Sequence, residues 1–514
     1  MANTSANNKR IAKNTMLLYL RLILTMLVSL YTSRVVLDTL GVVDFGIYNV
    51  VGGIVTMFGF LNGSMSTTTQ RYITIELGRG NMKQLHKVFN TCQIILGALS
   101  VLIIMFAETV GLWFLYNKMQ IPTDRMEASL WVYQTSVAAA VIMLMSVPYN
   151  ATIIAHERMS AFAYISILEV GLKLVLVYLL LVFSIDKLKL YSFLMLLVQL
   201  LIRLVYNIYC SKHFKETSFK LYWDLGLIRE MVNFTGWNLF GNIACIAYTQ
   251  GINILLNMFF GPVVNAARGI SVQVQNAINQ FSTNFQMALN PQITKLYAVG
   301  DYVDMHKLIC RSSKFSFLLL LLISLPVMVG THDVLTIWLK EVPEYSSVFL
   351  RLMIVTTFID SVANPLMVAA SSTGKVKLYQ SVIGFILLLI LPISYVVLKL
   401  GGNPQSVFIV HVAVCIVAFV VRLFIVRSMI GLRIGYYAKE ALLKCFIVTC
   451  IALPLPMTLR YMLPEGIPYF FVICILCIIS VSLSIYMFGL DKSEKSVVVR
   501  KVKSILLIRN DKCN

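Results

Sequence analysis

The chain has 514 residues, of which 58% are hydrophobic and only 13% charged, and its formal net charge is +20. A water-soluble protein of this length could not bury so much apolar surface, so a large soluble domain is excluded. A basic chain can also be a nucleic-acid-binding protein, but the lysines and arginines follow membrane topology instead, and we expect no nucleic-acid partner.

Apolar runs recur along the chain, each long enough to cross a bilayer as a helix. Because backbone polar groups in lipid must be satisfied within the segment, these runs predict helices rather than open sheet. We therefore expect an all-α, polytopic membrane protein with about 14 transmembrane helices. In chain order they cover residues 16–33, 45–68, 88–115, 130–149, 161–183, 190–210, 232–259, 270–290, 315–339, 348–370, 378–398, 407–425, 445–463 and 468–489.

The basic residues predict the orientation. With 14 crossings, about 29 of the 43 lysines and arginines fall on one side and about nine on the other. Basic loops mark the cytoplasmic side of a membrane protein, so both termini are predicted to be cytoplasmic.

Enzyme motifs are missing from the sequence. It has no phosphate-binding glycine-rich loop followed by Lys and Ser or Thr, no His-Glu-x-x-His pair and no cluster with metal-ligand spacing. The ten cysteines lie mostly inside apolar runs and suit small core residues. We expect no enzymatic activity, no cofactor and no bound metal.

An internal repeat appears when the chain is shifted by 220 positions. The matches are Gly41 with Gly261, Ile73-Thr74 with Ile293-Thr294, Gly80 with Gly300, and His86-Lys87 with His306-Lys307. They predict two six-helix lobes in one orientation around a central cavity, a layout typical of alternating-access transporters. The predicted domains are residues 1–210 (first lobe), 211–230 (cytoplasmic linker), 231–430 (second lobe) and 431–514 (two extra helices and a basic cytoplasmic tail).

Charged residues at membrane depth are costly and usually mark a site or a neutralised pair. Arg21 has no partner within its own helix, and Asp360 is nearly mid-membrane, so both favour the cavity. Glu169 and Lys173 are four residues apart, so they form a structural pair or a cavity site. Three arginines lie at outer helix ends, where an interface anchor and a cavity role are both open: Arg34, Arg268 and Arg351.

Two stripes of amides lie on the seventh and eighth predicted helices. The first holds Asn238, Asn242, Thr249 and Asn253, and the second holds Gln273, Asn276, Gln280 and Asn284. Because amides facing lipid are penalised, these faces must contact protein or water. They serve either hydrogen bonding between helices or a cavity lining that binds the hydroxyl groups of a glycan.

Several stretches resemble the polysaccharide-export flippases of the multidrug/oligosaccharidyl-lipid/polysaccharide (MOP) exporter superfamily. Ser-Arg-Val-Val-Leu at 33–37 and Leu-Gly-Val-Val-Asp-Phe-Gly-Ile-Tyr at 40–48 are similar to the family signature. Residues 236–241, 251–256, 261–269 and 289–293 resemble bacterial O-antigen and capsule members. The resemblance covers roughly the first 430 residues and says nothing about which sugar is carried.

The resemblance implies a flippase in a bacterial inner membrane that moves an undecaprenyl-diphosphate-linked oligosaccharide from the cytoplasmic to the periplasmic leaflet. The unit would serve O-antigen (lipopolysaccharide), capsule or exopolysaccharide assembly, without nucleotide hydrolysis. Membrane lipid and a glycan polymerase are the other candidate partners. By position, the candidates for binding the diphosphate are Arg21, Arg34, Arg268 and Lys173; Asp360 and Glu169 are candidates for ion coupling.

Two alternatives remain open at this point. One is a cation-coupled multidrug exporter of the sister branch, whose cavity should be dominated by acidic residues. The other is a membrane-embedded glycan polymerase or ligase, which needs a catalytic residue on an outer loop; Arg125, Asp186 and Glu344 are its candidates.

Overall fold

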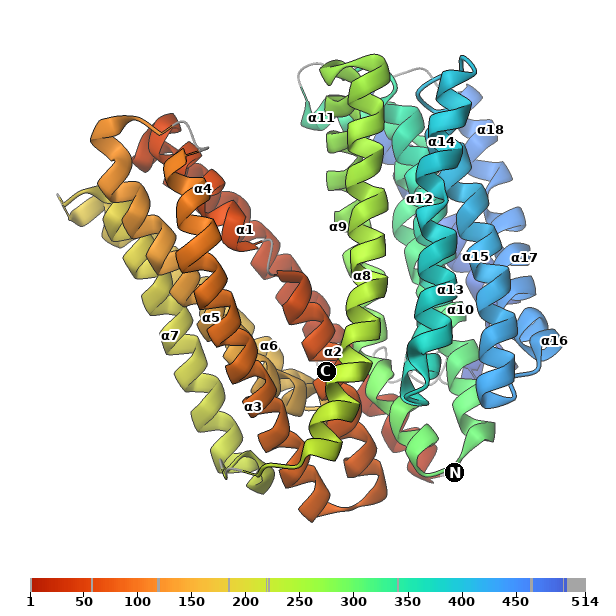
Figure 1. The fold of residues 1–514 in the computed structure, drawn as a ribbon. Helices are drawn as coiled ribbons and strands as arrows, with labels where there is room; N and C mark the ends of the chain where they lie inside the picture. The colour runs from red at the N-terminus through yellow and green to blue at the C-terminus, as the bar shows by residue number, and fades with distance from the viewer. Residues whose placement is uncertain are drawn as a thin grey trace, which may run out of the picture. The chain divides into compact units, whose positions relative to one another are not determined.

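The computed structural model describes residues 2–56, 59–117, 121–183, 185–218, 220, 222–339, 342–462, 466–492 and 494–496; some side chains within these ranges are not described. In these ranges every element is helical (Figure 1), which confirms the predicted all-α fold. The end of the predicted basic tail, from residue 497 on, lies outside the described residues.

The helices form two groups along the chain, one before Gly261 and one after it. The first group is α1 (Ala2–Thr56), α2 (Gly59–Arg79), α3 (Met82–Phe106), η1 (Ala107–Gly111), α4 (Leu112–Asn117), η2 (Thr123–Arg125), α5 (Met126–Ala155), α6 (Met159–Val182), α7 (Lys187–His213), η3 (Lys215–Thr217) and α8 (Leu225–Phe260). The second group is α9 (Pro262–Ala298), α10 (Tyr302–Val329), α11 (Thr331–Trp338), α12 (Ser346–Ser372), α13 (Val376–Leu388), α14 (Ile390–Lys399), α15 (Ser406–Ile430), α16 (Ile434–Tyr437), η4 (Ala438–Leu442), α17 (Leu443–Ala452), α18 (Pro454–Met462), α19 (Ile467–Ser484) and η5 (Ile485–Gly489).

Eleven helical segments in the described part are long and apolar enough to cross a membrane. They coincide with eleven of the 14 predicted spans. The other three predicted spans fall on α1, on the end of α1 with α2, and on α9; α1 also holds a shorter apolar stretch at Asn14–Ser29. A multi-pass membrane protein with 14 spans therefore fits the helices.

Three predicted spans are divided between two helices in the structure: 378–398 at Leu389, 445–463 at Leu453, and 315–339. Residues 315–339 were expected to form one helix, but α10 ends at Val329 and the short helix α11 begins at Thr331. Gly330 lies between them, and a Cβ at this position would come within 2.5 Å of the Phe470 ring. The close approach of α19 therefore requires glycine where the helix stops.

The chain forms two compact units. Unit 1 comprises Met1–Ile243, Met287–Asp301 and Ser371–Ser381, and unit 2 comprises Ala244–Gln286, Tyr302–Ala370 and Val382–Asn514. In unit 1, α5 packs against α7 and α2, and α1 packs against α6; in unit 2, α10 and α17 pack against α19, and α14 packs against α15. The predicted lobes divide the chain by duplication rather than by contact, and that division stays a prediction.

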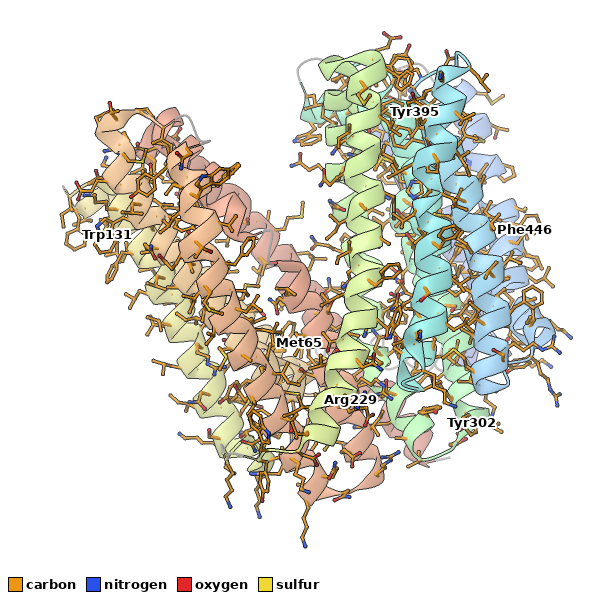
Figure 2. The ribbon with its side chains drawn as sticks, viewed as in Figure 1. Met65, Trp131, Arg229, Tyr302, Tyr395 and Phe446 are labelled. Carbon is orange, nitrogen blue, oxygen red and sulfur yellow. The ribbon has the colours of Figure 1, made fainter. Side chains whose placement is uncertain are left out.

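Large apolar side chains also cover the outside of each unit. Trp131 of unit 1 is 48% exposed, and Phe446 of unit 2 is 66% exposed. Figure 2 shows each of them on the outer face of its own unit. Exposed apolar surface of this extent suits lipid rather than water.

The repeat recurs in the local backbone geometry. The N–H of Gly80 donates to the carbonyl three residues before it (3.2 Å), and that of Asn81 to the carbonyl five residues before it (3.2 Å). At positions 220 residues later, Gly300 and Asp301 make the same two bonds, at 3.1 and 3.0 Å. Gly80 and Gly300 both have left-handed backbones, with φ of 70° and 78°. The matched sequences thus terminate α2 and α9 in the same way.

A second glycine pair behaves alike. Gly41 is the non-helical residue inside α1, and its φ of 78° equals that of Gly261, which separates α8 from α9. A left-handed residue at each position is what a duplicated turn needs, and glycine adopts it without steric cost.

Candidate functional site

Arg21 lies among the predicted site residues of unit 1. It is partly buried on α1, and its guanidinium lies over the Phe162 ring of α6, 4.7 Å from the ring centroid. Glu169 of α6 and Tyr206 of α7 act on it electrostatically. The contact between α1 and α6 therefore brings Arg21 toward the predicted acidic residue.

Glu169 and Lys173 pair with each other. The Lys173 ammonium donates to the Glu169 carboxylate at 2.7 Å, one helical turn away. The structural-pair alternative is therefore realised in this structure. The pairing leaves Lys173 with little net positive charge for a diphosphate. The Arg34 side chain lies outside the described residues.

Arg268 is the predicted site residue with the clearest surroundings in unit 2. Gly261 reverses the chain, and Pro262 begins α9, where its fixed φ suits a first helical position. This hairpin returns Arg268 to α8, where it donates to the Asn253 side-chain oxygen and to the Thr249 carbonyl, the latter at 2.9 Å. Arg268 is 6% exposed, and its Nε has no hydrogen-bond partner in the described part.

The first amide stripe makes contacts to other side chains. In unit 1, Asn238 accepts a hydrogen bond from Gln380 at 2.9 Å, and Asn242 donates to Ser64 at 2.7 Å. In unit 2, Asn253 accepts from Arg268. These three amides therefore hold neighbouring segments together, as the hydrogen-bonding alternative expects.

The second amide stripe is more open. Asn284 is buried and donates to the Gln280 carbonyl of its own helix at 2.7 Å. The side chains of Gln273, Asn276 and Gln280 are exposed on α9. Exposed amides within a span need water or a polar ligand, so these three keep the glycan-lining role as a prediction.

Asp360 of α12 is exposed and has Arg422 of α15 as its charged neighbour. Its role in ion coupling stays a prediction. The described residues contain no group of three or more His, Cys, Asp or Glu side chains that could hold a metal ion.

Sequence reasoning missed a three-residue ion cluster in unit 1. Arg125 donates through Nε to Asp44 at 2.8 Å, through a second nitrogen to the same carboxylate, and through Nη1 to Asp186 at 2.8 Å. Asp186 also caps α7, accepting from the N–H groups of Leu188 (3.0 Å) and Lys189 (3.2 Å). Burial alone raises the pKa of Asp186, but these N–H groups and Arg125 lower it below its usual value. Asp44 lies within the signature at 40–48, which was the available signal.

A second missed cluster surrounds Glu157, which is 4% exposed in the turn between α5 and α6. Its carboxylate accepts from Lys295 at 2.8 Å and from Gln292 at 3.1 Å, both on the end of α9. Asn14 of α1 donates to the Glu157 carbonyl at 3.3 Å. Glu157 and Lys295 are 138 positions apart in the sequence, so no local spacing predicts their pair.

Comparison with known proteins places this fold. The family model MatE matches residues 239–396, and no curated protein matches the sequence. An outward-facing multidrug resistance MATE family transporter of the MOP superfamily superimposes with a TM-score of 0.73 at 13% identity, covering 83% of this chain and 96% of its own. A MATE structure in the bent conformation gives 0.73 at 13% identity, covering 84% and 97%.

A third solved structure is a MOP superfamily transporter from Pyrococcus furiosus, described as having a binding pocket of reverse polarity that suggests a different function. It gives a TM-score of 0.67 at 14% identity and covers 82% of this chain and 96% of its own. At these identities the likeness shows the fold. The chain has the fold of the MATE transporters of the MOP superfamily, with a MatE match over about a third of its length.

Proposed function

We propose that the protein is a flippase that moves an undecaprenyl-diphosphate-linked oligosaccharide unit outward across a bacterial inner membrane by alternating access. The fold supports a transporter, because it is shared with MATE transporters along most of the chain. The substrate class is argued from the charges and amides within the spans.

The proposal of an anionic substrate rests on the sign of the charge that has no ionic partner among the described residues. Glu169 is paired with a lysine, and Asp360 has an arginine as its charged neighbour. Arg268, by contrast, makes hydrogen bonds only to an amide and a carbonyl oxygen, and it forms no ion pair among the described residues. A buried positive charge is costly unless an anion pairs with it. A diphosphate is such an anion, and guanidinium groups bind phosphate oxygens bidentately.

The glycan would meet the exposed amides of α9. Gln273, Asn276 and Gln280 lie at spacings of three and four, so they share one side of the helix. Each amide offers both a donor and an acceptor to sugar hydroxyls. The stripe favours a hydroxylated substrate without selecting a particular sugar.

The main alternative is a multidrug exporter, as named for the outward-facing MATE transporter. An exporter of organic cations should place uncompensated acidic groups along the spans, and the charges around Arg268 and Glu169 favour the opposite. The transporter from Pyrococcus furiosus, with its reverse-polarity pocket, supports the idea that this fold serves other substrates.

A membrane-embedded polymerase or ligase is less favoured. Two of its candidate catalytic residues, Arg125 and Asp186, are bound to each other, and Asp186 also caps α7. These contacts give both residues a structural role. Glu344 is exposed and stays untested.

The energetics require no nucleotide. Moving one charge across the membrane potential is worth about 2.3 kcal/mol per 100 mV, so two negative charges leaving a negative interior gain about 4.6 kcal/mol. An antiport of protons or sodium ions through Asp360 or Glu169 is the alternative coupling. If dissipating the potential and both ion gradients left flipping unchanged in vesicles, this account of the driving force would be wrong.

The cellular test is the lipid-linked glycan profile of cells with the gene deleted, then complemented with wild type or Arg21→Ala. We expect surface polysaccharide to disappear and undecaprenyl-linked single units to accumulate on the cytoplasmic face. Wild type should restore export, and Arg21→Ala should not. Single units that reach the periplasm and stay unpolymerised would instead identify a polymerase or ligase partner.

A further inference from the structure

Unit 1 contains a cavity of about 610 Å³ that none of the proposed diphosphate-binding residues lines. Its walls come from α2, from the first part of α8 and from the start of α13. Tyr72, Phe234 and Trp237 supply aromatic surface, and Lys375 and Lys377 supply two ammonium groups. An aromatic wall beside cations is the composition of a site for an amphiphilic anion.

The two lysines are available for a ligand. Both are exposed, and the Lys377 ammonium lies 5.2 Å from the centroid of the Trp237 ring. The acidic group in the lining, Glu230, accepts a hydrogen bond from the Tyr72 hydroxyl at 2.9 Å. The lining therefore carries an excess of one positive charge.

Arg71 adds a third cation directly behind this wall. It is 9% exposed, and its guanidinium lies 4.6 Å from the Tyr72 centroid and 4.7 Å from the Phe234 centroid. It donates one hydrogen bond, at 3.3 Å, to the Ser372 carbonyl, while Nε and Nη1 have no partner in the described part. Arg71 thus lies against two of the rings that line the cavity.

Gly374 makes room for that arginine. Its φ is 78°, and a Cβ on it would collide with the Arg71 guanidinium. The turn before α13 therefore places Arg71 and the two lysines around the same small volume.

The position of the cavity indicates a lipid. Lys375 directly precedes the candidate span Val376–Lys399, and Trp237 lies within the candidate span Leu225–Phe260. Lysine and tryptophan at a span boundary occupy the headgroup level of a bilayer. The exposed side chain of Leu378 continues the lining toward the apolar part of the span.

We infer that this cavity is a binding site for the phosphate headgroup of an anionic membrane lipid. The phosphate lies against Lys375 and Lys377, and the first part of the lipid chain lies along Trp237 and Leu378. The site is predicted to face the cytoplasmic leaflet, because ten predicted spans precede Lys375 and Lys377 and the N-terminus is predicted to be cytoplasmic.

The test measures lipid binding to the purified full-length protein in a neutral detergent. Phosphatidylglycerol, an isoprenyl diphosphate, phosphatidylcholine and inorganic phosphate are titrated separately, and the unfolding temperature is followed. Lys375→Gln/Lys377→Gln is compared with a matched control, Lys212→Gln/Lys215→Gln, which removes two exposed lysines of unit 1.

We expect at least one of the two anionic lipids to raise the unfolding temperature, with the zwitterionic phosphatidylcholine inactive. The Lys375/Lys377 variant should lose roughly tenfold or more in apparent affinity, and the control variant should bind as wild type. Comparing phosphatidylglycerol with the isoprenyl diphosphate identifies the source of the headgroup. If the two double variants bound the lipid with equal affinity, the inference would be overturned. It would also be overturned if inorganic phosphate raised the unfolding temperature as much as the lipids do.

A second measurement avoids dependence on the double variant. Brominated phosphatidylglycerol or a brominated isoprenyl diphosphate quenches tryptophan fluorescence on contact. The quenching that Trp237 contributes is the difference between wild type and Trp237→Phe. We expect that difference to saturate over the same concentrations as the thermal shift. The absence of any quenching at Trp237 would place the lipid elsewhere and reject the site.

Discussion

Replacing Arg268 with glutamine removes a buried guanidinium from α9. In the structure that group donates to the Asn253 side chain and to the Thr249 carbonyl, and its Nε has no partner in the described part. Arg268→Gln retains an amide that can bond to one of these oxygens, but it removes the positive charge.

The expected loss in substrate binding is large. A hydrogen bond to a charged group contributes about 1.5–3 kcal/mol, and a neutral one about 0.5–1.5 kcal/mol. Replacing a two-pronged contact with one neutral bond should therefore cost about 2–4 kcal/mol, or roughly 30- to 1,000-fold in apparent affinity. The folded state should change less, because the lost bonds are offset by removal of a buried charge.

The assay is flipping of a diphosphate-linked oligosaccharide in vesicles that contain purified protein, with the unfolding temperature measured in parallel. Arg268→Lys keeps the charge without the planar fork and should give an intermediate loss of about tenfold. Arg427→Gln is the matched control, because Arg427 is an exposed arginine in the last turn of α15 that has no proposed role in the site. If Arg268→Gln flips substrate as fast as wild type while remaining folded, the assignment of this residue is refuted.

Three further predictions concern the fold around the site. Arg125→Leu should lower the free energy of unfolding by about 1–3 kcal/mol; in a double-mutant cycle with Asp44→Asn, purely additive losses would contradict the ion pair. Gly300→Ala should cost about 1–2 kcal/mol in thermal unfolding, because its left-handed backbone disfavours a Cβ, and an unchanged unfolding temperature would argue against that geometry. Burial raises the pKa of Glu216, but the hydrogen bond with His156 lowers it below its usual value. The stabilisation should therefore be complete above about pH 4.3 and be lost as the pH falls further. Glu216→Gln should make the free energy of unfolding less dependent on pH in that range. A variant with the same pH dependence as wild type would count against the pair.

Much of the fold was predictable because it depends on local properties of the chain. Span length and hydropathy placed the membrane helices, and the spacing of matched glycines located equivalent turns at Gly80 and Gly300. The division between α10 and α11 was not predicted, nor was the approach of the Phe470 ring to Gly330 at that point. An apolar pattern does not contain that contact.

The site was predictable only where partners lie on one helix. The four-residue spacing of Glu169 and Lys173 predicted their pair correctly as one of two alternatives. The links from Arg125 to Asp44 and Asp186 join residues 81 and 61 positions apart. They depend on how each helix is rotated about its own axis, and the spacing of residues along one helix does not define that rotation. For the same reason the amide stripes indicated faces but not their partners.

The central claim is the class of substrate. The most direct measurement is outward movement of a diphosphate-linked oligosaccharide in vesicles containing the purified protein, beside uptake of an organic cation in the same vesicles, without nucleotide. We predict that the oligosaccharide is flipped at a rate that increases with an inside-negative potential, and that the cation is not transported. Transport of the cation together with failure to move the oligosaccharide would contradict the account.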